Sequence, residues 1–198
     1  MDPVSAIAVT LGVGWASGIN LYAAMLTLGV LGVTGAMTLP PDLQILTSPI
    51  VILAAGAMYF VNFFADKIPG VDSINDVLHT FIRSPAGALL AAGAAGQMGP
   101  EWQLAAGILG GTLAAGSHAT KAGARMLINT SPEPFSNIAA SLTEDVALFG
   151  GLTLALSHPI TFLCLLAVFI ALLVWLLPRL VRLVMASFRR LTARKQNP

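Results

Sequence analysis

The stretch PITFLCLLAVFIALLVWLLP, residues 159–178, contains no charged side chain. It is long enough to cross the hydrocarbon core of a bilayer as one helix, which takes about 20 apolar residues. The whole chain shares this bias: of its 198 residues 56% are hydrophobic and 10% are charged, and the mean hydropathy is +0.82. Soluble domains carry about 25% charged residues. The sequence therefore predicts an all-α fold, a polytopic membrane helical bundle.

Six segments meet the length and composition of a membrane-spanning helix, with turns rich in proline or glycine between them. They lie at about 4–34, 48–66, 84–98, 102–128, 135–157 and 159–178. With six spans and a cytoplasmic N-terminus, all ten lysines and arginines lie on or toward the cytoplasmic side, as the positive-inside rule requires. A five- or seven-span count is expected to break this pattern. We therefore predict a single integral membrane domain, 1–198, with both termini cytoplasmic.

Two short strings indicate an internal duplication. ASGINLYAA at 16–24 aligns with AAGSHATKA at 114–122, at an offset of 98 residues. Repeat 1 then covers about 1–99 and repeat 2 about 100–198, and three spans in each half make the repeats inverted, as in many transporters. The alignment puts Asn20 and His118 at equivalent positions near the bilayer centre. They are expected to form either an interhelical hydrogen bond or a paired polar gate.

The segment from Pro69 to Arg83 has the spacing of an amphipathic helix. Its polar residues recur at i, i+3, i+4, i+7 and i+11 and so share one helix face: Asp72, Asn75, Asp76, His79 and Arg83. One interpretation is a helix on the inner leaflet surface with its polar face to water. The other is a helix in the cytoplasmic mouth of a pathway, with its acids pointing inward.

Charged residues inside the fourth and fifth segments predict a buried pair. The sequence SPEP at 131–134 breaks the helix, so Glu144 and Asp145 lie about 12 Å inside the next one. Lys121 lies at a similar depth, and a charge left alone there costs about 2.5–3.5 kcal/mol. A Lys121–Glu144 pair is either a brace, with Asp145 facing water, or part of an ion or solute path.

The candidate site joins these groups into a path between the two repeats. The predicted path residues are Asn20, His118, Lys121, Glu144 and Asp145. The predicted cytoplasmic mouth comprises Asp66, Lys67, Asp72, Asn75, Asp76, His79, Arg125, Asn129, Glu133, Ser136 and Asn137. No enzymatic motif is present, and the histidine spacing matches no standard zinc set. We therefore expect no enzyme and no cofactor.

The ends and faces of the helices suggest partners. The tail RLVRLVMASFRRLTARKQNP, 179–198, mixes six basic residues with an apolar stripe. That pattern favours anionic lipid over nucleic acid. Small-residue faces such as Gly14-xxx-Gly18 predict a homo-oligomer, with a dimer favoured.

Four strings resemble a known family. ADKIPGVDS at 65–73, HATKAGAR at 118–125, SPEPFSNI at 131–138 followed by ED at 144–145, and ASGINLY near the start look like the bacterial integral membrane family called domain of unknown function 4126. The resemblance covers nearly the whole chain. It implies a place in the bacterial inner membrane but no reaction, substrate or cofactor. A GLR-like triplet often stands in that family where this chain has Gly18-Ile19-Asn20.

These features favour a membrane transport protein that moves a small ion or polar solute between two inverted repeats. Two alternatives stay open. The polar cytoplasmic pocket could bind a lipid headgroup, or the small-residue faces could serve a scaffold or assembly factor that transports nothing.

Overall fold

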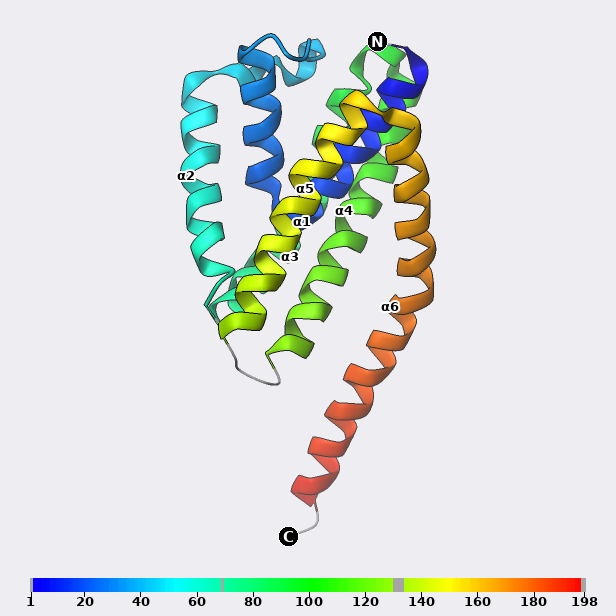
Figure 1. The fold of residues 1–198 in the computed structure, drawn as a ribbon. Coiled ribbons are helices and arrows are strands. Elements are labelled where there is room, and N and C mark those ends of the chain that lie inside the picture. The colour runs from blue at the N-terminus through cyan, green and yellow to red at the C-terminus, as the bar shows by residue number, and fades with distance from the viewer. Residues whose placement is uncertain (1, 69, 130–133, 197–198) are drawn as a thin grey trace. The chain divides into compact units, whose positions relative to one another are not determined.

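The computed structural model describes residues 2–68, 70–129 and 134–196. These residues form helices and no strand, as predicted (Figure 1). The elements are α1 Pro3–Val33, η1 Pro41–Thr47, α2 Pro49–Ala65, α3 Val71–Ala94, η2 Gly96–Met98, α4 Pro100–Ile128, α5 Pro134–Ser157 and α6 Pro159–Gln196, where η marks a 3₁₀ helix. Five of the six α-helices begin with proline, whose missing N–H costs nothing in a first turn.

Three helices are long and apolar enough to cross a membrane: α1, the part of α5 over Phe135–Ser157, and the part of α6 over Pro159–Arg179. The 3₁₀ helix η1 and α2, bent by 69° where they meet, make a fourth candidate if they count as one span. The helices α3 and α4 carry buried charges, which lower their hydropathy. The described residues therefore include membrane-type helices, as the composition predicts.

The third span and the amphipathic segment are one helix, not two. The Ser84-Pro85 pair is expected to start a helix, but Pro85 lies inside α3. A proline there removes one backbone hydrogen bond. Packing against α4 continues on both sides of it, and Ser84 donates a hydrogen bond to the Gly111 carbonyl at 3.0 Å. The prediction of a separate span over 84–98 is therefore wrong.

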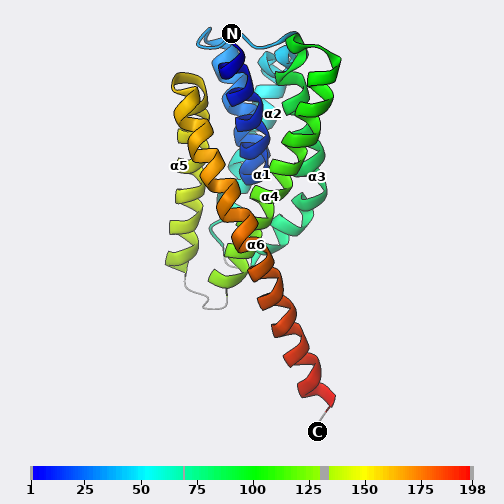
Figure 2. The same cartoon turned by 90° about the vertical axis from the view of Figure 1, so that its right-hand side faces the viewer.

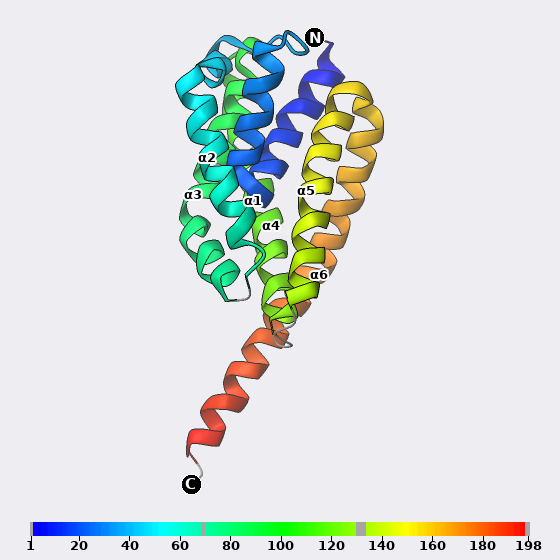
Figure 3. The ribbon, with the colours of Figure 1, turned by 60° about the vertical axis from the view of Figure 1, so that its left-hand side comes forward.

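Helix α1 reverses direction at Asn20, whose backbone is extended (φ −152°, ψ 102°). Positions at equal distances before and after Asn20 face each other: Val9 and Val13 line one small apolar cavity with Thr27 and Leu31. The start and the end of α1 consequently lie at the same end of the molecule (Figures 1 and 3). Although α1 has the length and composition of a membrane span, its two arms form a helical hairpin, so the continuous helix predicted over 4–34 is wrong.

The first arm of α1 runs parallel to α4. Gly14 lies against Gly110, where an added Cβ would come within 2.6 Å of the Gly110 Cα, and Gly18 lies against Ala114. Both pairs are 96 residues apart, so the contacts advance in the same direction along the two helices. The part of the string 16–24 that precedes Asn20 thus lies beside the string 114–122 and parallel to it, whereas the inverted relation predicted for the two strings requires them to be antiparallel. The Gly14-xxx-Gly18 face is used within the chain, not between subunits.

Helix α1 also occupies the centre of its compact unit. The chain divides into two such units, residues 1–163 and 164–198. In the first, α1 contacts α2, α3, α4 and α5, which surround it (Figure 2). Its buried side chains Val13, Ala16 and Leu28 belong to the main apolar core. The arms of α1 therefore position every element that contributes to the site described below.

The second unit is a continuation of α6. The helix passes through Pro178 without ending, so the basic tail is helical up to Gln196. Arg179 places its guanidinium 3.8 Å from the ring centre of Trp175.

Close packing of the first arm predicts the effect of Gly14→Ala. The new Cβ would overlap the Gly110 backbone, which cannot rotate away, so we expect a loss of about 1–3 kcal/mol in the free energy of unfolding. The matched control is Gly150→Ala, where nothing lies within 4 Å of the new Cβ. Thermal unfolding in detergent should show a lower midpoint for Gly14→Ala only. Equal midpoints for the two variants would contradict the parallel arm.

Candidate functional site

The break in α1 exposes backbone carbonyl groups that a continuous helix would satisfy. Two of them accept hydrogen bonds from buried bases on other helices. Arg83 Nη1 of α3 donates to the Gly18 carbonyl at 3.3 Å, and Lys121 Nζ of α4 donates to the Ile19 carbonyl at 3.4 Å. Cations are favoured at the carbonyl end of a helix. The two bases therefore stabilise the end of the first arm.

Asn20 starts the second arm. Its side-chain oxygen accepts a hydrogen bond from the Ala23 N–H at 3.2 Å, the usual geometry of a residue that caps a helix N-terminus. Asn20 is buried, with 3% of its surface exposed. The structure thus places this predicted path residue at the tip of the hairpin, where its first role is to hold the reversal.

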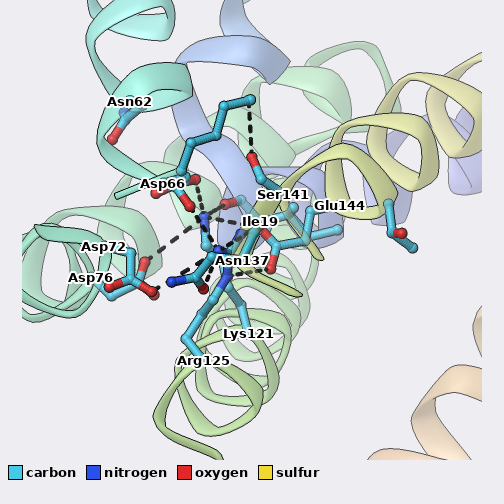
Figure 4. Close-up of polar contacts among 12 residues, drawn as sticks. Ile19, Asn62, Asp66, Asp72, Asp76, Lys121, Arg125, Asn137, Ser141 and Glu144 are labelled. Carbon is cyan, nitrogen blue, oxygen red and sulfur yellow. Dashed lines mark hydrogen bonds and ion pairs between the residues drawn. The ribbon is translucent and has the colours of Figure 1, made fainter. Parts of the chain in front are cut away.

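Lys121 lies among three carboxylates (Figure 4). Its Nζ donates a hydrogen bond to Asp66 Oδ2, lies 3.3 Å from Glu144 Oε2 and lies 3.8 Å from Asp76 Oδ1. The Lys121–Glu144 pair expected from matched depth is present. Sequence reasoning did not find the closer partner, Asp66, because that residue ends α2 and is separated from Lys121 by 55 positions.

Arg125 joins three helices at one end of the bundle. Its Nε and Nη2 donate to the two carboxylate oxygens of Glu144, at 3.1 and 2.8 Å. Its Nη1 donates to the Asp66 carbonyl at 2.7 Å and to the Asn137 side chain at 3.1 Å. Every nitrogen of this guanidinium has an acceptor, although Arg125 is only 1% exposed. Arg125 therefore connects α4 to the end of α2 and to the start of α5.

A second layer of hydrogen bonds lies beside Arg125. The Asn129 side chain donates to both oxygens of Asp72, at 3.0 and 2.9 Å, and the Asn137 side chain donates to the Asn129 oxygen at 2.8 Å. Asp72 is fully buried and Asp76 is 2% exposed. The acids of the 69–83 segment thus point into the bundle. Its apolar residues, such as Val77 and Phe81, are the exposed ones.

Arg83 is the main residue that the candidate list omitted. It is 1% exposed, and its Nη1 donates to Asp76 Oδ1 at 3.2 Å and to His118 Nδ1 at 3.0 Å. Since arginine only donates, His118 Nδ1 is the acceptor, and the ring proton lies on Nε2, which donates to Thr80 Oγ1 at 2.8 Å. His118 is therefore held neutral and positions Arg83. The i+11 spacing from Asp72 places Arg83 on the polar face of this segment, and that same signal could have added it to the candidate site.

Asn75 and His79 extend the network along α3. The Asn75 amide donates to Asn62 and, at 3.3 Å, to Asp66 Oδ1. His79 Nδ1 donates to the Asn75 carbonyl at 2.7 Å, and its ring lies edge-on to Tyr22, with 5.6 Å between ring centres. Asn62 was not predicted, because a lone asparagine in an apolar run resembles any other interhelical hydrogen bond.

Lys67 and Asp145 lie at the edge of the site, close enough for their charges to interact. Lys67 Nζ donates to Ser141 Oγ at 3.2 Å and lies 3.0 Å from the ring centre of Phe63. Burial lowers the pKa of Lys67, and the nearby charge of Asp145 opposes that shift. Asp145 is half-buried. Ser136 lies in the first turn of α5, half-buried, and Glu133 lies outside the described residues.

The ion pairs connect the two halves of the chain. Asp66, Asp72 and Asp76 come from α2, α3 and the turn between them, whereas Lys121 and Arg125 come from α4. Among the described residues, no three histidine, cysteine or acidic side chains are grouped so as to hold a metal ion.

A helical bundle with membrane-type helices and a buried ion-pair network at a broken helix defines a class of integral membrane protein. The chain belongs to the family described as domain of unknown function (DUF4126), whose family model matches residues 7–179. This match confirms the resemblance seen in the sequence and includes all the paired residues above. No curated protein and no solved structure matches the chain.

Arg125→Met should be strongly destabilising. It leaves Glu144 without its two-oxygen partner and the Asp66 carbonyl without its donor, so we expect a loss of about 3–5 kcal/mol. Glu144→Gln should cost less, because Lys121 keeps Asp66. Thermal unfolding of both single variants and the double variant measures the coupling. The control is the exposed Arg179→Met, expected to cost under about 1 kcal/mol. Additive losses at Arg125 and Glu144 would show that they do not interact.

We expect Asp66 to make the stability of the folded chain depend on pH in the acid range. Burial raises its pKa, but the Lys121 charge and hydrogen bond outweigh burial, so the pKa lies below 3.8 in the folded chain. The stabilisation that Asp66 contributes is fully present above the pKa that this residue has in the unfolded chain. It is lost as the pH falls through the pKa that Asp66 has in the folded chain. The unfolding midpoint of the wild type should thus fall more steeply below about pH 4 than that of Asp66→Asn. Parallel pH profiles would contradict this assignment.

Proposed function

We propose that this chain is a membrane transport protein that moves a small ion or polar solute past the break in α1. The observation that supports this most is the helical hairpin whose exposed carbonyls meet Arg83 and Lys121 inside the bundle. Backbone that is not helical is tolerated at membrane depth only where it is buried in protein or lines a polar pathway. Transporters place substrate sites at such discontinuous helices.

The topology that fits this hairpin has five crossings, by α2 to α6, with α1 entering and leaving on one side. It replaces the six-span, inverted-repeat arrangement expected from the sequence. The ten basic residues still lie on or toward one side, because the ends of α1 and the turns at 34–48, 95–99 and 158 contain no lysine or arginine. The positive-inside rule then assigns that side to the cytoplasm and the N-terminus to the opposite side.

The ion pairs serve in this proposal as the cytoplasmic closure of the path. Lys121 has three carboxylate neighbours, Asp66, Asp76 and Glu144. It can exchange one for another without becoming unpaired, which would be costly within a membrane. Opening would separate the acids of α2 and α3 from the bases of α4. Binding of the basic tail to anionic lipid and assembly into a homodimer remain part of the proposal, with the dimer on a surface other than Gly14-xxx-Gly18.

Flux tests this function directly. Purified protein in proteoliposomes should move at least one small ion or polar solute faster than protein-free vesicles. Lys121→Gln should abolish this flux, whereas the exposed Arg182→Gln should keep it. Circular dichroism and size-exclusion chromatography check that both variants fold. Equal flux through Lys121→Gln and wild type would contradict the path. A lipid-binding protein or a scaffold would show no flux with any solute.

Reporter fusions test the five-crossing topology. A reporter at the N-terminus and one inserted after Gly99 should both report the outer side, and a reporter after Pro198 should report the cytoplasm. The N-terminal reporter decides, since the six-span arrangement places it in the cytoplasm. A cytoplasmic N-terminus would therefore overturn the hairpin topology within the membrane.

A further inference from the structure

The guanidinium of Arg83 donates hydrogen bonds through only one of its three nitrogens, Nη1. Its Nη1 contacts three acceptors: the Gly18 carbonyl, Asp76 Oδ1 and His118 Nδ1. Its Nε and Nη2 are buried and have no hydrogen-bond partner. A buried donor without an acceptor is unfavourable, and more so when it is charged. The unpartnered edge of Arg83 thus requires an explanation.

Arg125 shows what this edge binds. In that residue the same two nitrogens, Nε and Nη2, hold both oxygens of the Glu144 carboxylate. The planar fork of an arginine matches a carboxylate in shape and donor spacing, which a lysine does not. The two arginines thus differ at this edge: in Arg125 the chain's own Glu144 fills it, and in Arg83 no hydrogen-bond partner does.

We propose that the Nε–Nη2 edge of Arg83 binds a small planar oxyanion, either the carboxylate of an organic solute or an inorganic ion of the same shape. The inference deepens the proposed function by naming the class of solute. It depends on that proposal only for the claim that the bound anion is carried across.

The surroundings of Arg83 favour a single negative charge. Arg83 bonds to Gly18, two residues before the second arm of α1 begins, and helix N-termini attract anions. Lys121, at the neighbouring carbonyl of Ile19, brings a second positive charge, which its own partners Asp66 and Glu144 offset. The negative charge of Asp76 disfavours a highly charged anion beside Arg83: its Oδ1 pairs with Arg83 and its Oδ2 is buried without a hydrogen-bond partner. That carboxylate would repel a dianion, so the site should take planar monoanions and reject sulfate.

Equilibrium binding to the full chain in detergent tests the site without requiring transport. Sodium formate, acetate and nitrate are titrated at constant ionic strength made up with sodium chloride, and the thermal unfolding midpoint is recorded. We expect a saturable rise with the planar ions and none with sulfate. Formate and acetate acting without nitrate identify a carboxylate solute, and nitrate acting equally well identifies the shape alone; both outcomes support the site.

Arg83→Lys is the decisive variant, because it keeps the charge and loses the planar edge. It should weaken the apparent affinity at least about tenfold. The matched control is Arg179→Lys, on the exposed part of α6, which should leave the affinity unchanged. Unchanged affinity in Arg83→Lys, or a sulfate effect equal to that of the planar ions, would overturn the proposal.

A measurement on the wild type covers the case in which Arg83→Lys does not fold. Radiolabelled acetate bound to the purified protein should be displaced by formate and not by chloride. Absence of saturable acetate and nitrate binding would overturn the site. Binding without flux in proteoliposomes would leave the site standing and contradict transport. Flux of another solute without oxyanion binding would support transport and contradict the oxyanion site.

Discussion

The unsatisfied backbone at the reversal of α1 is the constraint on which the rest of the structure depends. A helix that stops inside an apolar bundle leaves carbonyl groups that water cannot reach, and each needs a donor. Arg83 and Lys121 supply donors to Gly18 and Ile19. Buried bases in turn need acids, and these come from the end of α2, from α3 and from α5. One break in one helix thus accounts for the polar interior of the bundle.

The three buried bases differ in how completely the chain satisfies them. Arg125 has an acceptor for every nitrogen and acts as a structural connection between helices. Lys121 is shared among three acids, which lets it change partners. Arg83 is satisfied on one edge only. The proposed function therefore rests on the bases nearest the break, Arg83 and Lys121, whereas Arg125, near the end of α4, connects the helices.

Part of the site could be predicted from burial costs. Depth matching correctly paired Lys121 with Glu144, because both positions could be counted from nearby helix ends. The same reasoning left Arg83 out of the site, although helical spacing placed it on the polar face of the 69–83 segment, because its partners Gly18 and His118 lie far from it in the chain. It also missed the Asp66–Lys121 contact, which joins residues far apart in the chain. Helical spacing identified the polar face of α3 but could not show whether that face met water or protein.

Composition and hydropathy by themselves determined the helical membrane-type class and most helix ends, since apolar length and proline positions act locally. The asymmetry of the basic residues fits five crossings with a hairpin as well as it fits six, contrary to the expectation that an odd count breaks it, so it did not fix the number of spans. The reversal at Asn20 was decided only in the tertiary structure. The residues on either side of Asn20 do not distinguish a helix that continues from one that turns back. The choice depends on donors from Arg83 and Lys121, 63 and 101 positions later, which reach the broken end only after the helices have packed.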